Sequence, residues 1–278
     1  MKTRIISGIV GLALLFFVIW LGKIALGIAV FLVALIGIHE FYNCIEKAGH
    51  KPVRLIGYIS CIPVLLLGLY GSFNSYDRNI SPLGTLSYFM LGMFVLEAVL
   101  MGLIVFKHHK YNVVDISLSL LGIFYVVFMF SFIILTRNLK NGNYYIWFIF
   151  FAWVTDTMAY FTGRAFGKRK LSPEISPKKT VAGSIGGIIG CVAASTIYGI
   201  VLNSGNYLNV AIYHFIVIGA LVGILSQVGD LAASAIKRYA GVKDYGNLMP
   251  GHGGVLDRFD SILFIAPVIY FYISLVIK

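Results

Sequence analysis

The chain has 278 residues, of which 59% are hydrophobic and only 12% are charged. A soluble domain of this size needs more charge to cover its surface, so an ordinary soluble enzyme is excluded. The net charge of +11 is compatible with nucleic-acid binding, but no polar domain offers a groove, and we expect no nucleic-acid partner. We attribute the cations mainly to membrane topology and anionic lipid, and the remainder to a polyanionic substrate.

Apolar runs long enough to cross a bilayer follow one another along the chain. Backbone groups in lipid find no outside partner, so each run is expected to be a helix. We therefore predict an all-α, polytopic integral membrane protein with about nine transmembrane helices. Their expected ranges are 5–21, 24–40, 55–71, 83–106, 113–135, 144–163, 181–203, 209–229 and 262–277.

The basic residues predict the orientation of these helices. With the N-terminus inside, most of the 22 Lys and Arg residues fall in cytoplasmic segments, as the positive-inside rule requires. We therefore expect a multi-pass protein of the cell membrane with a cytoplasmic N-terminus. Residues 1–140 are expected to form a scaffold of about five spans. Residues 141–278 are expected to form the catalytic region, with its active site on the cytoplasmic side.

Two glycine pairs in the run 181–203 have the spacing of closely packed membrane helices. Gly183 with Gly187, and Gly186 with Gly190, are each four residues apart. Small residues at this spacing permit close approach of another helix. The pattern weakly predicts a packed face on this helix.

Ionisable side chains inside membrane helices usually have a function. Glu40, Glu97 and Asp115 lie in or near predicted spans, and we interpret them as helix-end residues in the headgroup region. Asp156 lies deep in its span, between two threonines, and is expected to face a polar cavity. Asp230 lies at the end of the predicted span 209–229 and is also expected to face a polar cavity.

The helix that contains Asp230 is predicted to continue into the cytoplasm through "GDLAASAIKRYAG" and to end at Gly241. Asp230, Ser234 and Lys237 are spaced four and then three residues apart, so they share one face of this helix. Arg238 and Lys237 lie in its last turn, where cations suit the helix dipole.

The stretch "VKDYGNLMPGHGG" is predicted to be a loop because of its proline and glycines. Gly251, Gly253 and Gly254 permit positive φ and close backbone approach, and such loops form amide nests for phosphate oxygens. The chain then re-enters a helix in "VLDRFDSILF", where Asp257 and Asp260 point the same way. Two carboxylates on one face, with Asp230 from another helix, form a hard-oxygen site suited to Mg²⁺.

A second polar segment, "GRAFGKRKLSPEISPKKTVAGS" at 163–184, holds six basic residues. Ser176 and Pro177 are expected to form a turn, and Thr180 is expected to cap the following helix. A helix start preceded by Lys178 and Lys179 is suited to binding an anion. The alternative interpretation is an ordinary positive-inside loop, and the residues alone leave both open.

Residues 234–261, "SAIKRYAGVKDYGNLMPGHGGVLDRFDS", resemble the signature of the phosphatidate cytidylyltransferases. The matching positions are Ser234, Lys237, Arg238, Lys243, Asp244, Pro250, His252, Gly253, Gly254, Asp257, Arg258 and Asp260. An upstream stretch is also similar to the family, at Asp156, Ala159, Tyr160, Gly163, Arg164, Phe166, Gly167, Lys168, Leu171, Ser172, Pro173 and "SPKKT". Two positions depart from the family pattern, since Ala182 and Ala233 stand where polar or acidic residues are common.

The resemblance implies that CTP and phosphatidic acid react to give CDP-diacylglycerol and pyrophosphate. The lipid phosphate is mostly ionised near neutral pH, so the reaction needs no strong general base. The obstacles are repulsion between two polyanions and charge on the leaving group, which metal ions and Lys or Arg side chains offset. The resemblance also implies a second cation beside Mg²⁺ and a homodimer.

These expectations assign roles to the polar residues of both segments. The expected magnesium ligands are Asp230, Asp257 and Asp260. The expected phosphate contacts are Lys178, Lys179, Lys237, Arg238 and Arg258, with hydroxyl donors from Ser176 and Thr180. Further expected substrate-binding residues are Ser234, Lys243, Gly253 and Gly254. Three roles stay open. His252 either orients the turn or a phosphate, or only forms hydrogen bonds to the backbone. Asp244 either binds a metal ion or the ribose, or forms an ion pair with Lys243, and Asp156 either holds a basic residue in place or completes the cation site.

Two other functions compete with this one. In an ion-coupled transporter, Asp156 and Asp230 would serve ion coupling, but inverted repeats are not evident. A CTP-dependent lipid kinase of related architecture would transfer the γ rather than the α phosphate of CTP. A CDP-alcohol phosphotransferase would need an Asp-Gly-x-x-Ala-Arg pattern, which this chain lacks.

Overall fold

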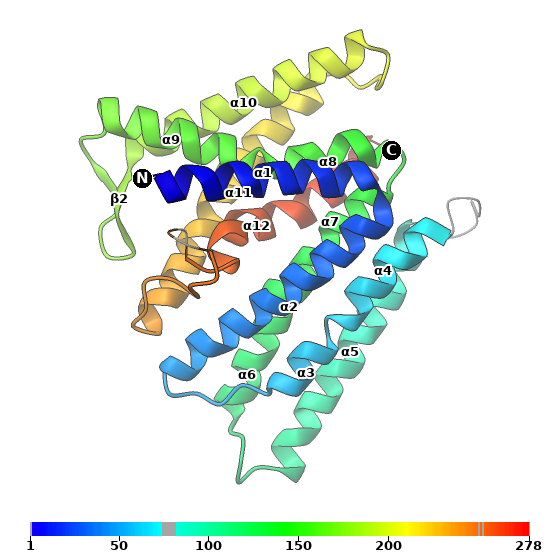
Figure 1. Cartoon of the computed structure of the whole chain (residues 1–278), viewed down its shortest axis with the longest axis vertical. Coiled ribbons are helices and arrows are strands. Elements are labelled where there is room, and N and C mark those ends of the chain that lie inside the picture. Colours follow the sequence, from blue (N-terminus) through cyan, green and yellow to red (C-terminus); the bar gives the residue numbers. More distant parts are fainter. Residues whose placement is uncertain (1, 74–81, 250, 252, 278) are drawn as a thin grey trace. The chain divides into compact units, whose positions relative to one another are not determined.

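The computed structural model describes residues 2–73, 82–249, 251 and 253–277, and almost all of its regular structure is helical (Figure 1). The helices are α1 Lys2–Leu21, α2 Lys23–Lys47, α3 Arg54–Ile59, α4 Ile62–Phe73, α5 Pro82–Phe106, α6 Val113–Gly122, η1 Ile123–Phe128, α7 Met129–Asn138, α8 Gly142–Phe150, α9 Ala152–Phe166, α10 Val181–Ser204, α11 Ile212–Tyr239, α12 Leu256–Tyr272 and η2 Ile273–Ile277. The two strands are β1 Lys170–Ser172 and β2 Ser176–Thr180. The predicted all-α class is confirmed apart from this hairpin.

Within the described residues, five helical stretches are long and apolar enough to cross a membrane. They are Lys23–Lys47, Val113–Asn138, Val181–Ser204, Ile212–Tyr239 and Leu256–Ile277. The remaining predicted spans also coincide with helices: 5–21 with α1, 83–106 with α5, 55–71 with α3 and α4, and 144–163 with α8 and α9. The chain is therefore a multi-pass membrane protein.

The chain divides into two compact units. The first contains Met1–Asn138 and Tyr239–Arg258, and the second contains Leu139–Arg238 and Phe259–Lys278. The division of function between residues 1–140 and 141–278 stays a prediction.

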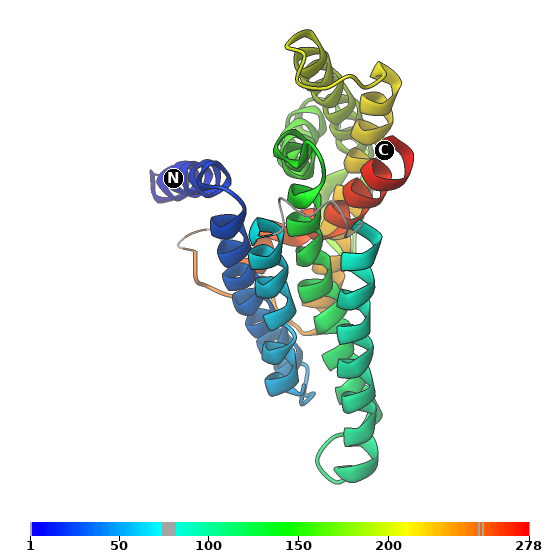
Figure 2. The same ribbon diagram turned by 90° about the vertical axis from the view of Figure 1, so that its right-hand side faces the viewer.

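In the first unit, α2 lies beside α4 and α7, and α5 lies beside α6 (Figures 1 and 2). Helices α2 and α4 approach each other closely at Gly27 and Gly68, since a Cβ atom on Gly27 would lie 2.6 Å from the Cα atom of Gly68. Two glycines facing each other thus allow the backbones of α2 and α4 to touch.

Two of the predicted spans are interrupted and form two separate helices each. The run 55–71 is divided into α3 and α4 around Cys61, and Pro63 explains the break. A proline has no N–H to donate, and its ring clashes with the carbonyl group four residues back, here that of Ile59. The run 144–163 is divided into α8 and α9 at Phe151, whose N–H bonds to Phe148 only three residues back.

In the second unit, α9 and α10 pack along each other. The four glycines with membrane-packing spacing all face α9: Gly183 lies against Ala159, Gly186 against Thr162, Gly187 against Thr155 and Ala159, and Gly190 against Met158. The weakly predicted packed face is confirmed. On α11, Gly219 and Gly223 approach the backbone of α10 in the same way.

The basic segment between α9 and α10 forms an antiparallel hairpin of β1 and β2, with Ser172 opposite Ser176. The predicted turn at Ser176 and Pro177 is wrong, because both residues belong to β2 and the chain reverses at 173–175. A two-stranded ribbon consists of edge strands only, so it tolerates a proline that cannot donate to a neighbour. Helix α10 begins directly after β2.

Candidate active site

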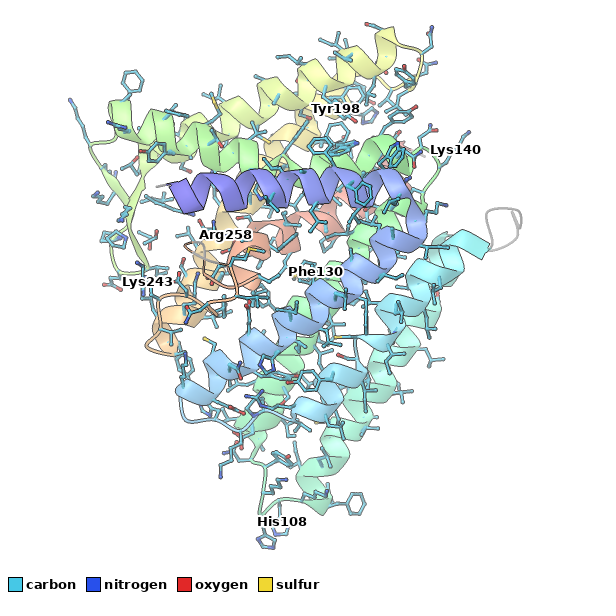
Figure 3. All side chains as sticks on the ribbon, viewed as in Figure 1. His108, Phe130, Lys140, Tyr198, Lys243 and Arg258 are labelled. Atoms are coloured by element: carbon cyan, nitrogen blue, oxygen red, sulfur yellow. The ribbon has the colours of Figure 1, made fainter. Side chains whose placement is uncertain are left out.

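The first unit carries a polar pocket on the connection between α11 and α12. Figure 3 marks Lys243, in this connection, and Arg258, in the first turn of α12. The pocket has a volume of about 500 Å³. Its lining residues are Lys243, Asp244, Asn247, Met249, Gly251, Gly253 and Arg258. Two cations beside flexible glycines make this pocket suited to an anion.

The glycines of the connection adopt the conformations that the sequence predicts. Gly241, directly after α11 and its cap, has φ +66°, and Gly251 and Gly253 have φ +76° and +86°. Gly254 does not have positive φ. Pro250 and His252 lie outside the described residues, so the role expected for His252 stays a prediction.

Asp257 holds this connection in place from the first turn of α12. Its Oδ2 atom accepts hydrogen bonds from the N–H groups of Tyr245, at 2.8 Å, and Gly254, at 2.9 Å. The Asp257 side chain is buried, and a Cβ atom on Gly253 would lie 2.9 Å from the same oxygen. One oxygen of this expected metal ligand is thus already bonded to backbone.

Glu40 is a second buried carboxylate of the same unit, and the sequence interpretation of it is wrong. Helix α2 continues to Lys47, so Glu40 is not at a helix end, and it is only 5% exposed. Its two oxygens accept hydrogen bonds from the N–H groups of Val255, at 3.0 Å, and Leu256, at 2.8 Å. Only a contact distant in sequence reveals this role, and no local motif indicated it.

The other two carboxylates interpreted as helix-end residues differ from each other. Asp115 is confirmed as one: it forms a capping box with Asn112 at the start of α6 and also accepts from the Lys51 N–H at 2.7 Å. Glu97 lies exposed within α5, well before that helix ends.

In the second unit, the β1–β2 hairpin contacts helix α11 through an ion pair. Lys179 of β2 forms an ion pair with Asp230, and their side chains are 25% and 27% exposed. The hydroxyl group of Ser234 donates to Asp230 Oδ1 at 3.4 Å, which confirms the predicted shared helix face. Lys237, on the same face, is buried, whereas Arg238 is exposed.

Asp260 belongs to the second unit, which contains α12 from Phe259 onward. Its side chain is buried. Its Oδ1 atom accepts from the N–H of Ser261 at 2.7 Å. The charged side chains that act on it are Asp230, Lys237 and Asp156. Asp156 is itself exposed on α9. The structure thus brings together, within this unit, expected site residues from α9, β2, α11 and α12.

Thr180 caps α10 as predicted, because its Oγ1 atom accepts from the Gly183 N–H at 3.1 Å. Its hydroxyl is buried against Gly163 and Gly167. Lys178 is exposed on β2 and Ser176 is half-buried. Their expected substrate contacts stay predictions.

Two carboxylates of the second unit, Asp230 and Asp260, influence each other electrostatically. Within the part of the chain that the structure describes, no three His, Cys, Asp or Glu side chains are grouped as a metal site. Mg²⁺ is commonly held by one or two carboxylates, with waters and substrate phosphates completing its octahedron. Asp230 and Asp260 interact electrostatically and provide such a pair of hard oxygen donors.

Comparison with known proteins extends the likeness over the whole chain. The model of the cytidylyltransferase family matches residues 2–276. The phosphatidate cytidylyltransferase of Bacillus subtilis is 33% identical over 282 residues, covering 99% of this chain and 98% of that protein. Those of Staphylococcus haemolyticus and Staphylococcus saprophyticus are 33% and 34% identical, each over 97% of both chains. The similarity therefore includes the N-terminal helices as well as the C-terminal motifs.

Proposed function

We propose a function from one premise: the chain belongs to the cytidylyltransferase family. It is a phosphatidate cytidylyltransferase, which joins CTP and phosphatidic acid to give CDP-diacylglycerol and pyrophosphate in phospholipid synthesis. The observation that carries this proposal is the full-length similarity to three proteins of that name. The basic pocket on the signature connection, with Lys243 and Arg258, supports it.

The chemistry requires two polyanions to meet. A phosphomonoester carries about 1.5 to 2 negative charges near neutral pH, so the lipid phosphate attacks the α phosphorus of CTP without a strong base. Lys179, Lys237 and Arg258 lower the repulsion and stabilise charge on the departing pyrophosphate. Lys178, Arg238 and Lys243 add further positive charge along the same two segments.

Magnesium is proposed as the cofactor, and Asp230 and Asp260 would hold it. When bound, the ion would neutralise the CTP phosphates and orient them for in-line displacement. Asp257 is proposed as a third ligand. A second cation stays part of the proposal. Asp244 and Ser234 are proposed to contact the nucleotide or its metal.

The finer membrane arrangement is also proposed. We infer about nine spans, a cytoplasmic N-terminus, an active site on the cytoplasmic side of the cell membrane and a homodimer. The bias of Lys and Arg toward one set of connecting segments supports the orientation. Phosphatidic acid would enter laterally from the bilayer, since both acyl chains are insoluble in water.

The test supplies the purified protein with CTP labelled at the α phosphate, in micelles that contain phosphatidate, and follows the transfer of label to lipid. Label is expected in the lipid phase with release of unlabelled pyrophosphate. Transfer of γ label to lipid, with none from the α position, would instead identify a CTP-dependent lipid kinase. No labelled lipid from either position, with substrate-independent ion flux in proteoliposomes, would identify a transporter.

A further inference from the structure

Glu40 connects helix α2 to a segment more than two hundred residues away. Its carboxylate receives two successive N–H groups, from Val255 and Leu256, at the point where α12 begins. The first N–H groups of a helix have no partner inside the helix. A carboxylate placed there satisfies two of them and also interacts favourably with the helix dipole.

The connection is shaped around this carboxylate. A Cβ atom on Gly246 would lie 2.5 Å from Glu40 Oε1, and one on Gly254 would lie 2.5 Å from both Glu40 oxygens. Neither glycine has positive φ. Lack of space beside Glu40, and not backbone conformation, therefore explains why these two positions have no side chain.

The residues that Glu40 holds lie within the signature, directly before its last charged residues. Asp257 follows Leu256, and Arg258, which lines the basic pocket, is next. Asp257 in turn accepts hydrogen bonds from the N–H groups of Tyr245, in the first half of the connection, and Gly254, near its end. The connection is thus held by two buried carboxylates, Glu40 from outside the signature and Asp257 from within it.

We propose that Glu40 is a positioning residue for cytidylyl transfer, an inference that rests on the proposed function. It sets the first turn of α12 and so the directions of Asp257 and Arg258. In this role Glu40 acts through its hydrogen bonds to the backbone of Val255 and Leu256. A carboxylate that only stabilised the fold could be lost without changing the kinetics of the molecules that remain folded.

The experiment compares Glu40→Gln with Glu46→Gln in purified full-length protein. Glu46 lies on the same helix, is exposed and pairs with Arg54 at 2.6 Å, so it controls for loss of a carboxylate from α2. In Glu40→Gln one acceptor oxygen becomes an NH₂ group that faces a backbone N–H. Positioning partners of this kind typically change activity about 10- to 100-fold. We expect kcat/KM for CTP to fall by about this factor in Glu40→Gln and to stay unchanged in Glu46→Gln.

A second readout is independent of turnover. Backbone amide exchange in residues 243–258 should become faster in Glu40→Gln, whereas exchange in α9 and α10 should not change. Wild-type kinetics together with wild-type exchange in folded Glu40→Gln would overturn the proposal. If wild type transfers no label, the proposed function fails, and the exchange of residues 243–258 still decides whether Glu40 holds them.

A second variant covers the case in which Glu40→Gln does not fold. Gly246→Ala keeps the carboxylate but pushes it off the Val255 and Leu256 N–H groups, because the added methyl group would lie 2.5 Å from Oε1. We expect the same loss of kcat/KM and the same faster exchange. Wild-type values of both in Gly246→Ala would count against the positioning role.

Discussion

Lys179 of strand β2 forms an ion pair with Asp230 of helix α11. The two residues come from the two polar segments that the sequence singled out separately, "SPKKT" and "VGDLAAS". An ion pair that is about a quarter exposed contributes at most about 1 kcal/mol to stability. This small contribution is compatible with the roles proposed above, in which Lys179 binds a CTP phosphate and Asp230 binds a metal ion.

Replacing Lys179 by Ala should chiefly weaken the use of CTP. A charge-assisted contact of about 1.5–3 kcal/mol corresponds to an increase of about 10- to 100-fold in the KM for CTP. Steady-state kinetics at saturating phosphatidate would measure it, with thermal unfolding expected to be unchanged. Lys179→Arg, which keeps the charge, is the control. An unaltered CTP response in Lys179→Ala would remove this residue from the nucleotide site.

Replacing Asp257 by Asn should separate its two roles. The amide oxygen can still accept from the Tyr245 and Gly254 N–H groups, so the melting temperature should stay close to that of wild type. The lost negative charge should nevertheless abolish turnover if the second oxygen binds metal. Asp257→Ala loses both hydrogen bonds and should destabilise the fold, by about 1–3 kcal/mol for each buried N–H left unpaired. Activity in Asp257→Asn would leave this residue a purely structural role.

Replacing Asp260 by Asn should stop the reaction while the protein remains folded. The Asn oxygen can still accept the Ser261 N–H, which Asp260 accepts at 2.7 Å. The variant should therefore elute like wild type in detergent on size-exclusion chromatography. Ser261→Ala, which removes a neighbouring hydroxyl group but no charge, is the matched control. Turnover at the wild-type rate in Asp260→Asn would exclude it as a magnesium ligand.

Chelation of divalent cations should abolish label transfer, and added Mg²⁺ should restore it. The reason is that the paired carboxylates Asp230 and Asp260 repel the substrate phosphates unless a cation lies between them. The measurement is α-label transfer before and after EDTA, followed by a magnesium titration. Full activity in EDTA would contradict the proposed cofactor without affecting the family assignment.

Replacing Gly27 by Ala should destabilise the first unit. The added Cβ atom would lie 2.6 Å from Gly68 Cα, so α2 and α4 must separate, at a cost of about 1–3 kcal/mol. Thermal unfolding in detergent would measure the effect. Gly102→Ala, on α5 with no atom within 4 Å of the added methyl group, is the control and should be neutral or slightly stabilising. Equal melting temperatures for the two variants would contradict the packing described here.

Much of this protein follows from local sequence. Apolar runs identify the helices because the bilayer leaves backbone groups no other partner. The Thr180 cap, the end of α11 before Gly241 and the packed glycines of α10 were all predictable, since each depends on residues within a few positions of one another. The two polar segments and their chemistry were also evident, because charge is rare elsewhere in the chain.

Contacts distant in sequence could not be predicted in this way. Tertiary structure alone decided that Lys179 lies against Asp230, that the "SPKKT" stretch is a strand, and that Glu40 holds the start of α12. Glu40 resembles a helix-end residue until the remote N–H groups of Val255 and Leu256 are known. The physical reason is that hydropathy and helix propensity act over a few residues, whereas the partner of a buried charge depends on which segments the fold brings together.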